Sequence, residues 1–317
     1  MKIILDVTKL VAEGKLTPAE AERLTALASR DTGTFAINML LSFGALVVAC
    51  GVVALAPAAE TGIALGVVMI ATGLYVARRF AAQWGLLGTA MVIVGALGLC
   101  GGTIVWADGR LPGFLVASAV LLVLAPVARS GLLAALAPLA LVGLLGSSAD
   151  SLYHSYTAPA DEPTITIVLF SALALGAYLV ARRAPPAYEA LALVFARVSL
   201  LIVNVAFWVG SLWGDRPGLS WRRADPGALA AAFRVPDVVF VAAWAAALIA
   251  VMVWATRTNR RWLFNTAATF GAIHFITQWF ERLGANPLSV ILAGLLIVAV
   301  AVGLWRYNQA APAQPAA

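Results

Sequence analysis

The sequence predicts an all-α fold, a polytopic bundle of about ten transmembrane helices preceded by a small N-terminal helical hairpin. Hydrophobic residues make up 62% of the 317 residues and charged residues only 11%, whereas soluble domains carry about 25% charged residues. The apolar residues occur in blocks about as long as a bilayer is thick. Short loops separate the blocks, and arginine pairs recur in alternate loops. Together these features indicate a multi-pass protein of the lipid bilayer.

Residues 1–31 are predicted to form the hairpin, on the cytoplasmic side. Gly14 is expected to end a first amphipathic helix in a left-handed conformation. The segment Thr17-Pro18-Ala19-Glu20 combines a capping box with proline at the first helical position, which predicts a second helix through Leu27. A hairpin of this size cannot bury enough apolar surface to be stable alone. We therefore interpret it either as a cytoplasmic cap or as a site for a protein partner or self-association.

Residues 32–307 are predicted to form one membrane domain. A helix needs about 20 apolar residues to cross roughly 30 Å of hydrocarbon. Ten blocks approach this length, near residues 35–56, 62–77, 86–106, 112–128, 132–146, 164–181, 190–213, 238–256, 262–280 and 288–305. The fifth block is short and contains Pro138, and the ninth carries several polar residues. These two are the weakest members of the series.

The arginines predict the orientation of the chain, because short cytoplasmic loops are enriched in Lys and Arg. If residues 1–31 are cytoplasmic, the loops that return to the cytoplasm hold Arg78, Arg79, Arg129, Arg182, Arg183, Arg257, Arg260 and Arg261. The alternate loops hold almost no basic residue. Ten spans place both termini in the cytoplasm, and we expect the protein in a bacterial inner membrane. The net charge of +6 is dispersed among these loops, so no nucleic-acid partner is expected.

The longest loop, residues 215–237, is the exception to this pattern. It falls on the external side yet carries Arg216, Arg222, Arg223 and Arg234. We expect it to fold back on the membrane surface with Trp213 and Trp221 at the headgroups, and Asp225-Pro226 to begin a short helix. The tail, residues 308–317, is rich in Ala and Pro and is predicted to be disordered.

Two polar seams are the candidate functional features, because a polar side chain in a bilayer is costly unless it faces protein or water. Arg197, Asn204 and Ser211 recur every seven residues in the seventh block and so share one helix face. In the ninth block, polar side chains follow Gly271 at spacings of three or four. These are His274, Gln278 and Glu281. If both seams face the bundle interior, they could line a solvated path or a small binding site.

Simpler interpretations of the same residues remain open. Arg197 lies roughly 12 Å from the cytoplasmic end of its block and could extend to the headgroups instead. His274 could be a neutral imidazole hydrogen-bonded between helices. No metal site is expected, because the only other histidine, His154, falls in an external loop. Cys50 and Cys100 could form a disulfide if their helices touch, but two buried thiols are the simpler expectation. The glycine pairs at 62/66 and 98/102 predict close helix packing and no chemistry.

Enzyme signatures are absent from the sequence. There is no HExxH, GxSxG or GxxxxGK[ST] motif and no aspartate pair within the apolar blocks. We therefore expect neither catalytic residues nor a cofactor.

The arrangement resembles a bacterial family of predicted membrane proteins, the domain of unknown function 2157 family. Two stretches carry the resemblance: the opening LVAEGKLTPAEAERL with the first apolar block LLSFGALVVACGVVALA, and the closing FGAIHFITQWFERLGANPLSVILAGLLIVAVAVGLWRYN. They cover roughly a third of the chain. Family members usually have an Asn-Trp pair after the first span, where this chain reads Ala56-Pro57-Ala58-Ala59-Glu60. The resemblance implies a polytopic fold and no catalytic residues.

Three functional hypotheses follow from these features. The first is a non-enzymatic accessory or sensing protein of the membrane whose hairpin binds a partner. The second is a small secondary transporter, because ten spans with both ends inside are similar to the drug/metabolite exporters, which are built from two inverted five-span halves. The two halves of this chain have no evident internal similarity, which weighs against it. The third is an intramembrane enzyme acting on lipids, in which Arg197 or the external arginines bind phosphate.

Overall fold

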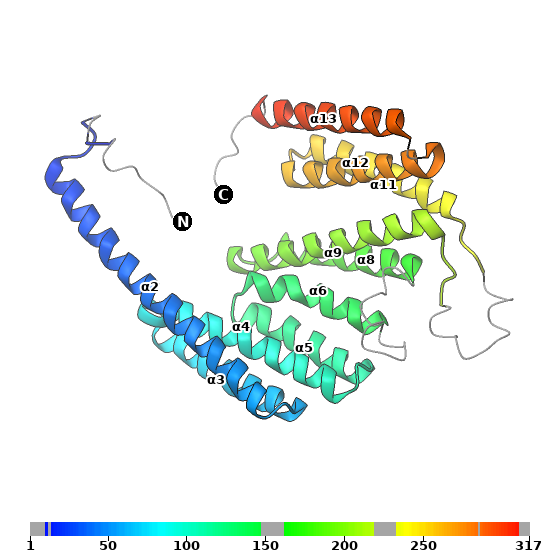
Figure 1. Cartoon of the computed structure of the whole chain (residues 1–317). Coiled ribbons are helices and arrows are strands. Elements are labelled where there is room, and N and C mark those ends of the chain that lie inside the picture. Colours follow the sequence, from blue (N-terminus) through cyan, green and yellow to red (C-terminus); the bar gives the residue numbers. More distant parts are fainter. Residues whose placement is uncertain (1–9, 12–13, 147–161, 219–232, 285, 311–317) are drawn as a thin grey trace. The chain divides into compact units, whose positions relative to one another are not determined.

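The computed structural model describes residues 10–11, 14–146, 162–218, 233–284 and 286–310, and within them it contains ten named helices (Figure 1). These are α2 (Pro18–Leu55), α3 (Ala59–Arg79), α4 (Ala81–Trp106), α5 (Leu111–Val127), α6 (Gly131–Gly146), α8 (Pro163–Ala181), α9 (Pro186–Trp213), α11 (Asp237–Arg257), α12 (Arg261–Leu283) and α13 (Pro287–Ala310). The chain divides into two compact units. Unit 1 contains Met1–Leu144 and Pro186–Leu191, and unit 2 contains Leu145–Pro185 and Ala192–Ala317.

Six helical segments are long and apolar enough to cross a membrane, which indicates a multi-pass membrane protein. They are Phe35–Leu55 within α2, together with α3, α4, α8, α9 and α11. Three further apolar helical segments, α5, α6 and Pro287–Gly303 of α13, are shorter. The helix α12 has 23 residues but is too polar to join the six. Each predicted block is therefore helical, whereas the count of about ten spans stays a prediction.

The N-terminal capping signals are confirmed, but the predicted second helix does not end before the membrane. Gly14 has a φ of +67°, and the Thr17 hydroxyl accepts a hydrogen bond from the Glu20 amide while the Glu20 carboxylate accepts from the Thr17 amide. From Pro18 the helix α2 continues unbroken to Leu55. Nothing between them stops it, because Gly33 alone costs only about 1 kcal/mol in a helix. The first helix of the predicted hairpin lies largely outside the described residues.

In unit 1 the helices α3 and α4 pack against each other through glycines, as the glycine spacings predicted. A Cβ atom on Gly66 would lie 2.5 Å from the backbone nitrogen of Leu99, and one on Gly73 would lie 2.8 Å from the carbonyl oxygen of Gly88. The facing glycines are Gly62, Gly66 and Gly73 of α3 and Gly88, Gly95, Gly98 and Gly102 of α4. Two backbones this close gain their contact energy directly from van der Waals packing, the main force between helices in lipid.

Asn38 connects α2 to a kink in α4. The helix α4 departs from helical geometry at Trp84 (φ −123°, ψ 17°). Asn38, which is only 4% exposed, donates to the Gln83 carbonyl oxygen at 2.7 Å and accepts from the Leu87 amide at 3.3 Å. Its side chain thus satisfies backbone groups that the kink would leave without partners.

The two cysteines are separate free thiols. Cys50 is exposed, whereas Cys100 is buried and its Sγ donates to the Ala117 carbonyl oxygen at 3.7 Å. The disulfide alternative is therefore wrong. The expectation that both thiols are buried holds only for Cys100.

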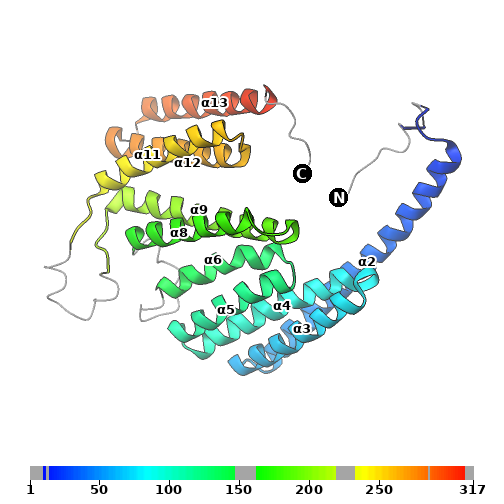
Figure 2. The same cartoon turned by 180° about the vertical axis from the view of Figure 1, so that it is seen from behind.

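Unit 2 contains α8, most of α9, and α11 to α13, and α11, α12 and α13 lie side by side in both views (Figures 1 and 2). Trp244 and Leu248 of α11 and Ala267 of α12 form its buried cluster. The helix α13 runs to Ala310, so the predicted disordered tail is wrong for residues 308–310. The other tail residues, 311–317, lie outside the described residues. The same holds for His154 and for the predicted helix after Asp225.

Candidate functional site

The two predicted polar seams meet in unit 2 at a tryptophan. Asn204 of α9 accepts a hydrogen bond from the Trp244 indole N–H at 3.0 Å and donates to the Leu200 carbonyl oxygen at 2.8 Å. The other side of Trp244 contacts His274 of α12, edge to face, with ring centroids 4.8 Å apart. Trp244 is only 1% exposed. Trp244 therefore lies between Asn204 and His274. Because of this ring, the two polar side chains do not face a common cavity.

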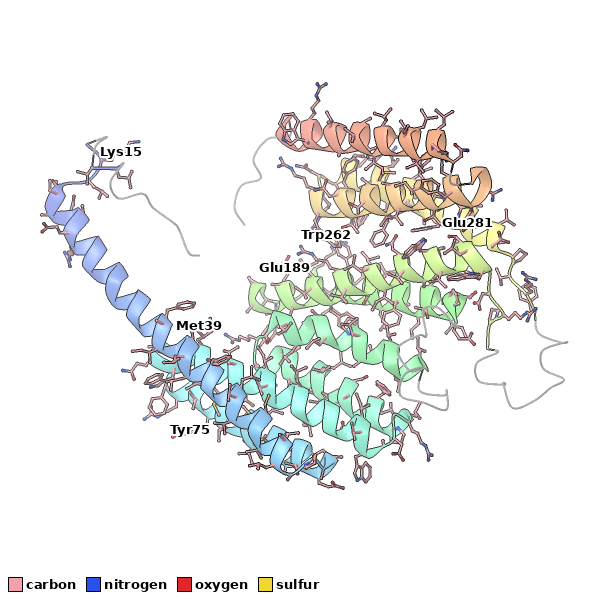
Figure 3. All side chains as sticks on the ribbon, viewed as in Figure 1. Lys15, Met39, Tyr75, Glu189, Trp262 and Glu281 are labelled. Carbon is pink, nitrogen blue, oxygen red and sulfur yellow. The ribbon has the colours of Figure 1, made fainter. Side chains whose placement is uncertain are left out.

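The other members of the seams do not join this contact. Ser211 is buried and donates to the Trp208 carbonyl oxygen of its own helix at 2.7 Å. The buried atoms His274 Nδ1, Gln278 Nε2 and Trp279 Nε1 have no hydrogen-bond partner in the part of the chain that the structure describes. Glu281 is exposed near the end of α12 opposite to Trp262 (Figure 3). The candidate site predicted from the two seams is thus divided among separate environments.

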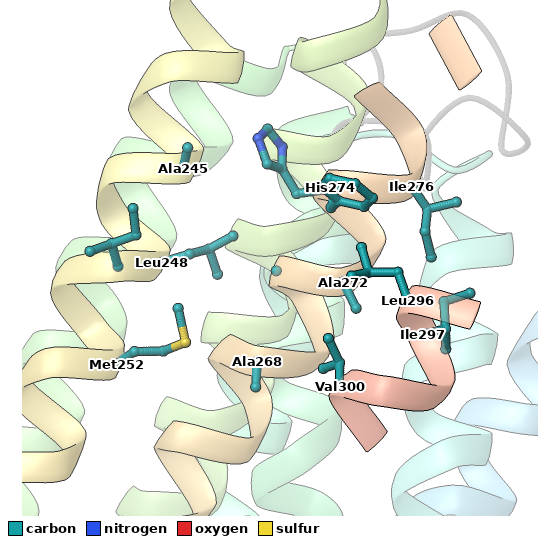
Figure 4. Close-up of a pocket in the computed structure, with 13 residues that line it drawn as sticks. Ala245, Leu248, Met252, Ala268, Ala272, His274, Ile276, Leu296, Ile297 and Val300 are labelled. Carbon is teal, nitrogen blue, oxygen red and sulfur yellow. The ribbon is translucent and has the colours of Figure 1, made fainter. Parts of the chain in front are cut away.

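A pocket of about 370 Å³ lies between α11, α12 and α13 beside His274. Its lining is apolar apart from His274, which projects from α12 toward α11 (Figure 4). The wall opposite α11 consists of Leu296, Ile297 and Val300 of α13. It offers no charged group to orient a ligand, so it is a poor recognition site.

Arg197 lines a second and larger cavity, of about 720 Å³, which we call the Arg197 cavity. Its walls come from the second half of α8, the middle of α9, the end of α11 and the start of α12. Its lining residues are Ser171, Ala174, Leu175, Tyr178, Leu193, Ala196, Arg197, Leu200, Trp254, Thr258, Asn259, Arg260, Arg261, Trp262 and Leu263. All of them belong to unit 2. The volume is within the usual range for ligand pockets, about 300 to 1,000 Å³.

The turn between α11 and α12 brings two arginines to this cavity. Asn259 adopts a left-handed conformation (φ +53°), which asparagine tolerates better than most residues. The amides of Arg260 and Asn259 donate to the carbonyl oxygens of Ala255 and Thr256, at 2.9 and 3.3 Å, the two bonds of a Schellman motif. The helix α12 then begins at Arg261. This turn places Arg260 and Arg261 next to the cavity.

The arginines of the cavity lie against aromatic rings. The Arg197 guanidinium lies 4.9 Å from the ring centroid of Trp262, and the Arg260 guanidinium lies 5.9 Å from that of Tyr178. Tyr178 in turn contacts Trp254, edge to face, with centroids 6.0 Å apart. Such cation–π contacts contribute about 0.5 to 1 kcal/mol at exposed sites and hold the guanidinium plane in place. The aromatic rings therefore orient two of the three arginines.

The described residues that line the cavity carry an excess of positive charge. Among its described lining residues are three arginines and neither Asp nor Glu. Arg197 is exposed and lies against Trp262. The cavity can thus attract an anion, and its apolar walls can accept a hydrocarbon chain.

A second polar cluster fixes the base of the 215–237 loop, beside the start of α8. Asp215 accepts from the Thr164 amide at 2.8 Å, and Glu162 accepts from the Gly218 amide at 2.7 Å. Asp215 and Val235 also exchange backbone hydrogen bonds, at 2.9 and 2.8 Å. Gly214 (φ +68°) makes this pairing possible, because a Cβ there would lie 2.7 Å from the Val235 carbonyl oxygen. The loop therefore begins in a fixed position.

Burial and hydrogen bonds shift the pKa of Asp215 in this cluster. Desolvation raises the pKa of Asp215, hydrogen bonds from Thr164 lower it, and the nearby Glu162 carboxyl raises it, with an upward net shift. Glu162 is 2% exposed and Asp215 is 7% exposed. The two carboxyls accept hydrogen bonds from backbone amides of α8 and of the loop, which indicates a structural role for this cluster.

Sequence reasoning identified Arg197 but not its neighbours. Arg260 and Arg261 served only as orientation signals, and Trp262, Tyr178 and Trp254 received no role. Aromatic residues within a turn of the arginine loops were an available signal, because such pairs often recognise anionic amphiphiles at a membrane surface. Searches for relatives add nothing to this picture: no family model, no curated protein and no solved structure matches the chain.

Proposed function

We propose that this protein is a non-enzymatic accessory or sensing component of a bacterial inner membrane that binds an amphipathic anion in the Arg197 cavity. The observation that carries the proposal is a cavity with three arginines and, among its described lining residues, no carboxylate. Arg197 and Arg260 are exposed on the surface of the protein alone, and a cation within a membrane domain needs a counter-charge or water. An anionic ligand would supply the counter-charge and would fill the apolar remainder of the cavity.

The absence of a catalytic constellation among these lining residues favours binding over chemistry. Arginine stays protonated at any physiological pH and so cannot act as a general base. The polar residues beside the arginines are Ser171, Tyr178, Thr258 and Asn259. None of them has a histidine or carboxylate beside it, among the described lining residues, to activate it as a nucleophile.

The orientation of the chain belongs to the same proposal. Arg182 and Arg183 follow α8, and Arg257 ends α11, close in sequence to the cavity residues Tyr178, Thr258, Asn259 and Arg260. The enrichment of arginine in cytoplasmic loops would place this end of α8 and α11 in the cytoplasm, together with both termini. Residues 1–31 would then be available on the same side for a protein partner or for self-association. Membership of the domain of unknown function 2157 family is compatible with this role and stays a proposal.

A secondary transporter is the second candidate, and one observation favours it. Among the described residues, each compact unit contains five of the named helices when α9 is counted with unit 2, which holds most of it. Two five-helix halves are the pattern of the drug/metabolite exporters. Against this candidate, Trp244 fills the space where the polar residues of α9 and α12 meet, so a transport path along them would require that side chain to move.

Ligand-dependent stabilisation of the purified protein tests the proposal. The melting temperature in a neutral detergent is measured with anionic amphiphiles, with zwitterionic amphiphiles of equal chain length, and with soluble organic phosphates. We expect anionic amphiphiles to raise it, and Arg197→Ala to abolish the increase, because ligands that bind only the folded state stabilise it. Equal shifts in the wild type and in Arg197→Ala would contradict the proposal. A proteoliposome flux that Trp244→Phe alters would support the transporter instead.

A further inference from the structure

We infer that the anion is the phosphate group of a glycerophospholipid, which enters the Arg197 cavity from the surrounding leaflet. This inference rests on the proposed function and specifies its ligand. A phosphate group could belong to a membrane lipid or to a soluble phosphate ester. The distribution of polar and apolar residues in the cavity favours the lipid.

The cavity combines a polar and charged lining at the turn between α11 and α12 with a mainly apolar lining along α8 and α9, where Arg197 is the one charged residue among those described. Asn259, Arg260 and Arg261 lie in or beside the turn between α11 and α12, at one end of the cavity. Ser171 and Ala174 of α8 and Leu200 of α9 lie deeper along their helices. Ser171 precedes the end of α8 at Ala181 by ten residues, which corresponds to roughly 15 Å at the helical rise. A soluble phosphate would use only the first part of this depth, whereas a lipid with an acyl chain would use all of it.

Arg197 and Arg260 line the same cavity, so both guanidinium groups are candidates to bind one phosphate. The guanidinium of Arg197, on α9, stacks on Trp262, the second residue of α12, and Arg260 directly precedes that helix. A guanidinium stacked on a ring still presents its N–H groups at the edge of its plane, where a phosphate can accept two of them. Among the described residues, the guanidinium groups of Arg197 and Arg260 make cation–π contacts and neither a hydrogen bond nor an ion pair. Both are therefore available to a ligand.

The start of α12 adds a positive potential to that of the arginines. No side chain caps its first turn, and the first turn of a helix carries partial positive charge on its backbone N–H groups. Arg261, Trp262 and Leu263 of this turn all line the cavity. A phosphate between Arg197 and this turn would interact with the arginines and with the helix terminus together.

Two aromatic residues place the charged end of the cavity at the level of the lipid headgroups. Tyr178 and Trp254 each lie three residues before the last residue of α8 and α11, two of the helices that are apolar enough to cross a membrane. Tyr and Trp concentrate at this depth because they combine an apolar ring with a polar group. A phosphate of the same leaflet would thus lie beside the arginines without leaving the interface.

Native mass spectrometry of the full-length protein tests the inference. The protein is released from nanodiscs of phosphatidylcholine that contain either phosphatidic acid or phosphatidylglycerol, and retained lipids are identified. Glycerol 3-phosphate is added to pure phosphatidylcholine nanodiscs in a parallel arm. Variants are Arg197→Ala and Arg260→Ala, which change different elements, and the control is Arg282→Ala, an exposed arginine near the far end of α12.

We expect selective retention of the anionic lipids. Each cavity variant should weaken this retention at least about tenfold, because a charge-assisted hydrogen bond contributes about 1.5 to 3 kcal/mol. Arg282→Ala should leave it unchanged. Retention of glycerol 3-phosphate as strong as that of the lipids would overturn the inference, while anion binding in the cavity would stand without the requirement for an amphipathic ligand. Retention of phosphatidylcholine at the same level, unaffected by the variants, would overturn the inference as well. Failure of every anion to bind would overturn both.

Discussion

Unit 1 and unit 2 differ in the surroundings of Asn38 on the one hand and of the Arg197 cavity on the other. In unit 1 Asn38 is buried and completes the hydrogen bonds of a kinked backbone, and the interface of α3 and α4 consists of glycines in van der Waals contact. In unit 2 three arginines line a cavity without a carboxylate among its described residues, and Gln278 Nε2 has no partner among them. Asn38 of unit 1 thus serves folding, whereas we propose that the arginines of the cavity in unit 2 serve a ligand.

Truncation of Trp244 should have the largest effect on stability. Trp244→Ala removes a fully buried ring that contacts Asn204, Phe207 and His274, and we expect a loss of about 3 kcal/mol or more. The change can be measured by unfolding in mixed micelles of increasing sodium dodecyl sulfate. The control is Trp213→Ala, whose side chain is 69% exposed and whose removal should cost far less. Equal losses would show that Trp244 is not the centre of the packing in unit 2.

A methyl group in the glycine interface should have the next largest effect. Gly66→Ala places a Cβ 2.5 Å from backbone of α4, which cannot move without separating the two helices. We expect a loss of about 1 to 3 kcal/mol in the same unfolding assay. Gly101→Ala is the matched control, because a Cβ there meets no atom within 4 Å. It should be neutral or stabilising, since alanine favours helix. Destabilisation by both variants would implicate helix propensity or insertion and not packing.

A pair of amide substitutions compares the two units directly. Asn38→Leu leaves the Gln83 carbonyl and the Leu87 amide without their side-chain partner, so unit 1 should lose about 1 to 2 kcal/mol. Gln278→Leu removes an amide nitrogen without a described partner and should be neutral or stabilising. Both can be measured as shifts of the unfolding midpoint. Destabilisation by Gln278→Leu would mean that its side chain has a structural role, and the contrast between the units would fail there.

The dependence of stability on pH should show the smallest effect. Burial raises the pKa of Asp215, so the folded state favours the protonated carboxyl. The resulting stabilisation is present below the ordinary aspartate pKa of about 3.9 and is lost as pH rises through the raised value. Asp215→Asn should flatten this part of the profile of melting temperature against pH. A profile identical to that of the wild type would assign the titration to another group.

Features of the fold that depend on the length and hydropathy of a segment could be predicted well. Features that depend on the packing of one helix against another could not. Each apolar block became a helix because only a helix satisfies its backbone in lipid. The end of the predicted hairpin was wrong because residues 28–34 contain no strong helix breaker, so α2 continues to Leu55. The contact of Trp244 with Asn204 and His274 depends on the rotation of three helices, which a single-helix pattern does not determine.

The candidate site was predicted only in part, because the contacts of its residues depend on how the helices pack. Arg197 was recognisable because an arginine within an apolar block is rare. Its contact with Trp262 depends on the Schellman turn at Asn259, which sets where α12 begins. Asn204 and Ser211 share a helix face with Arg197, yet they contact Trp244 and their own backbone. The spacing identified the face but not which members line a cavity.

The location of a bound lipid is the most direct test of the account. A phosphatidic acid analogue with a photoactivatable acyl chain is crosslinked to the protein in nanodiscs, and the labelled peptides are identified by mass spectrometry. We predict that labels concentrate on residues 171–178 of α8 and 193–200 of α9, and that Arg197→Ala or an excess of unlabelled phosphatidic acid removes them. The proposed lipid site would be contradicted if labels covered the exposed apolar face of α2 as densely as these segments and were unchanged in Arg197→Ala.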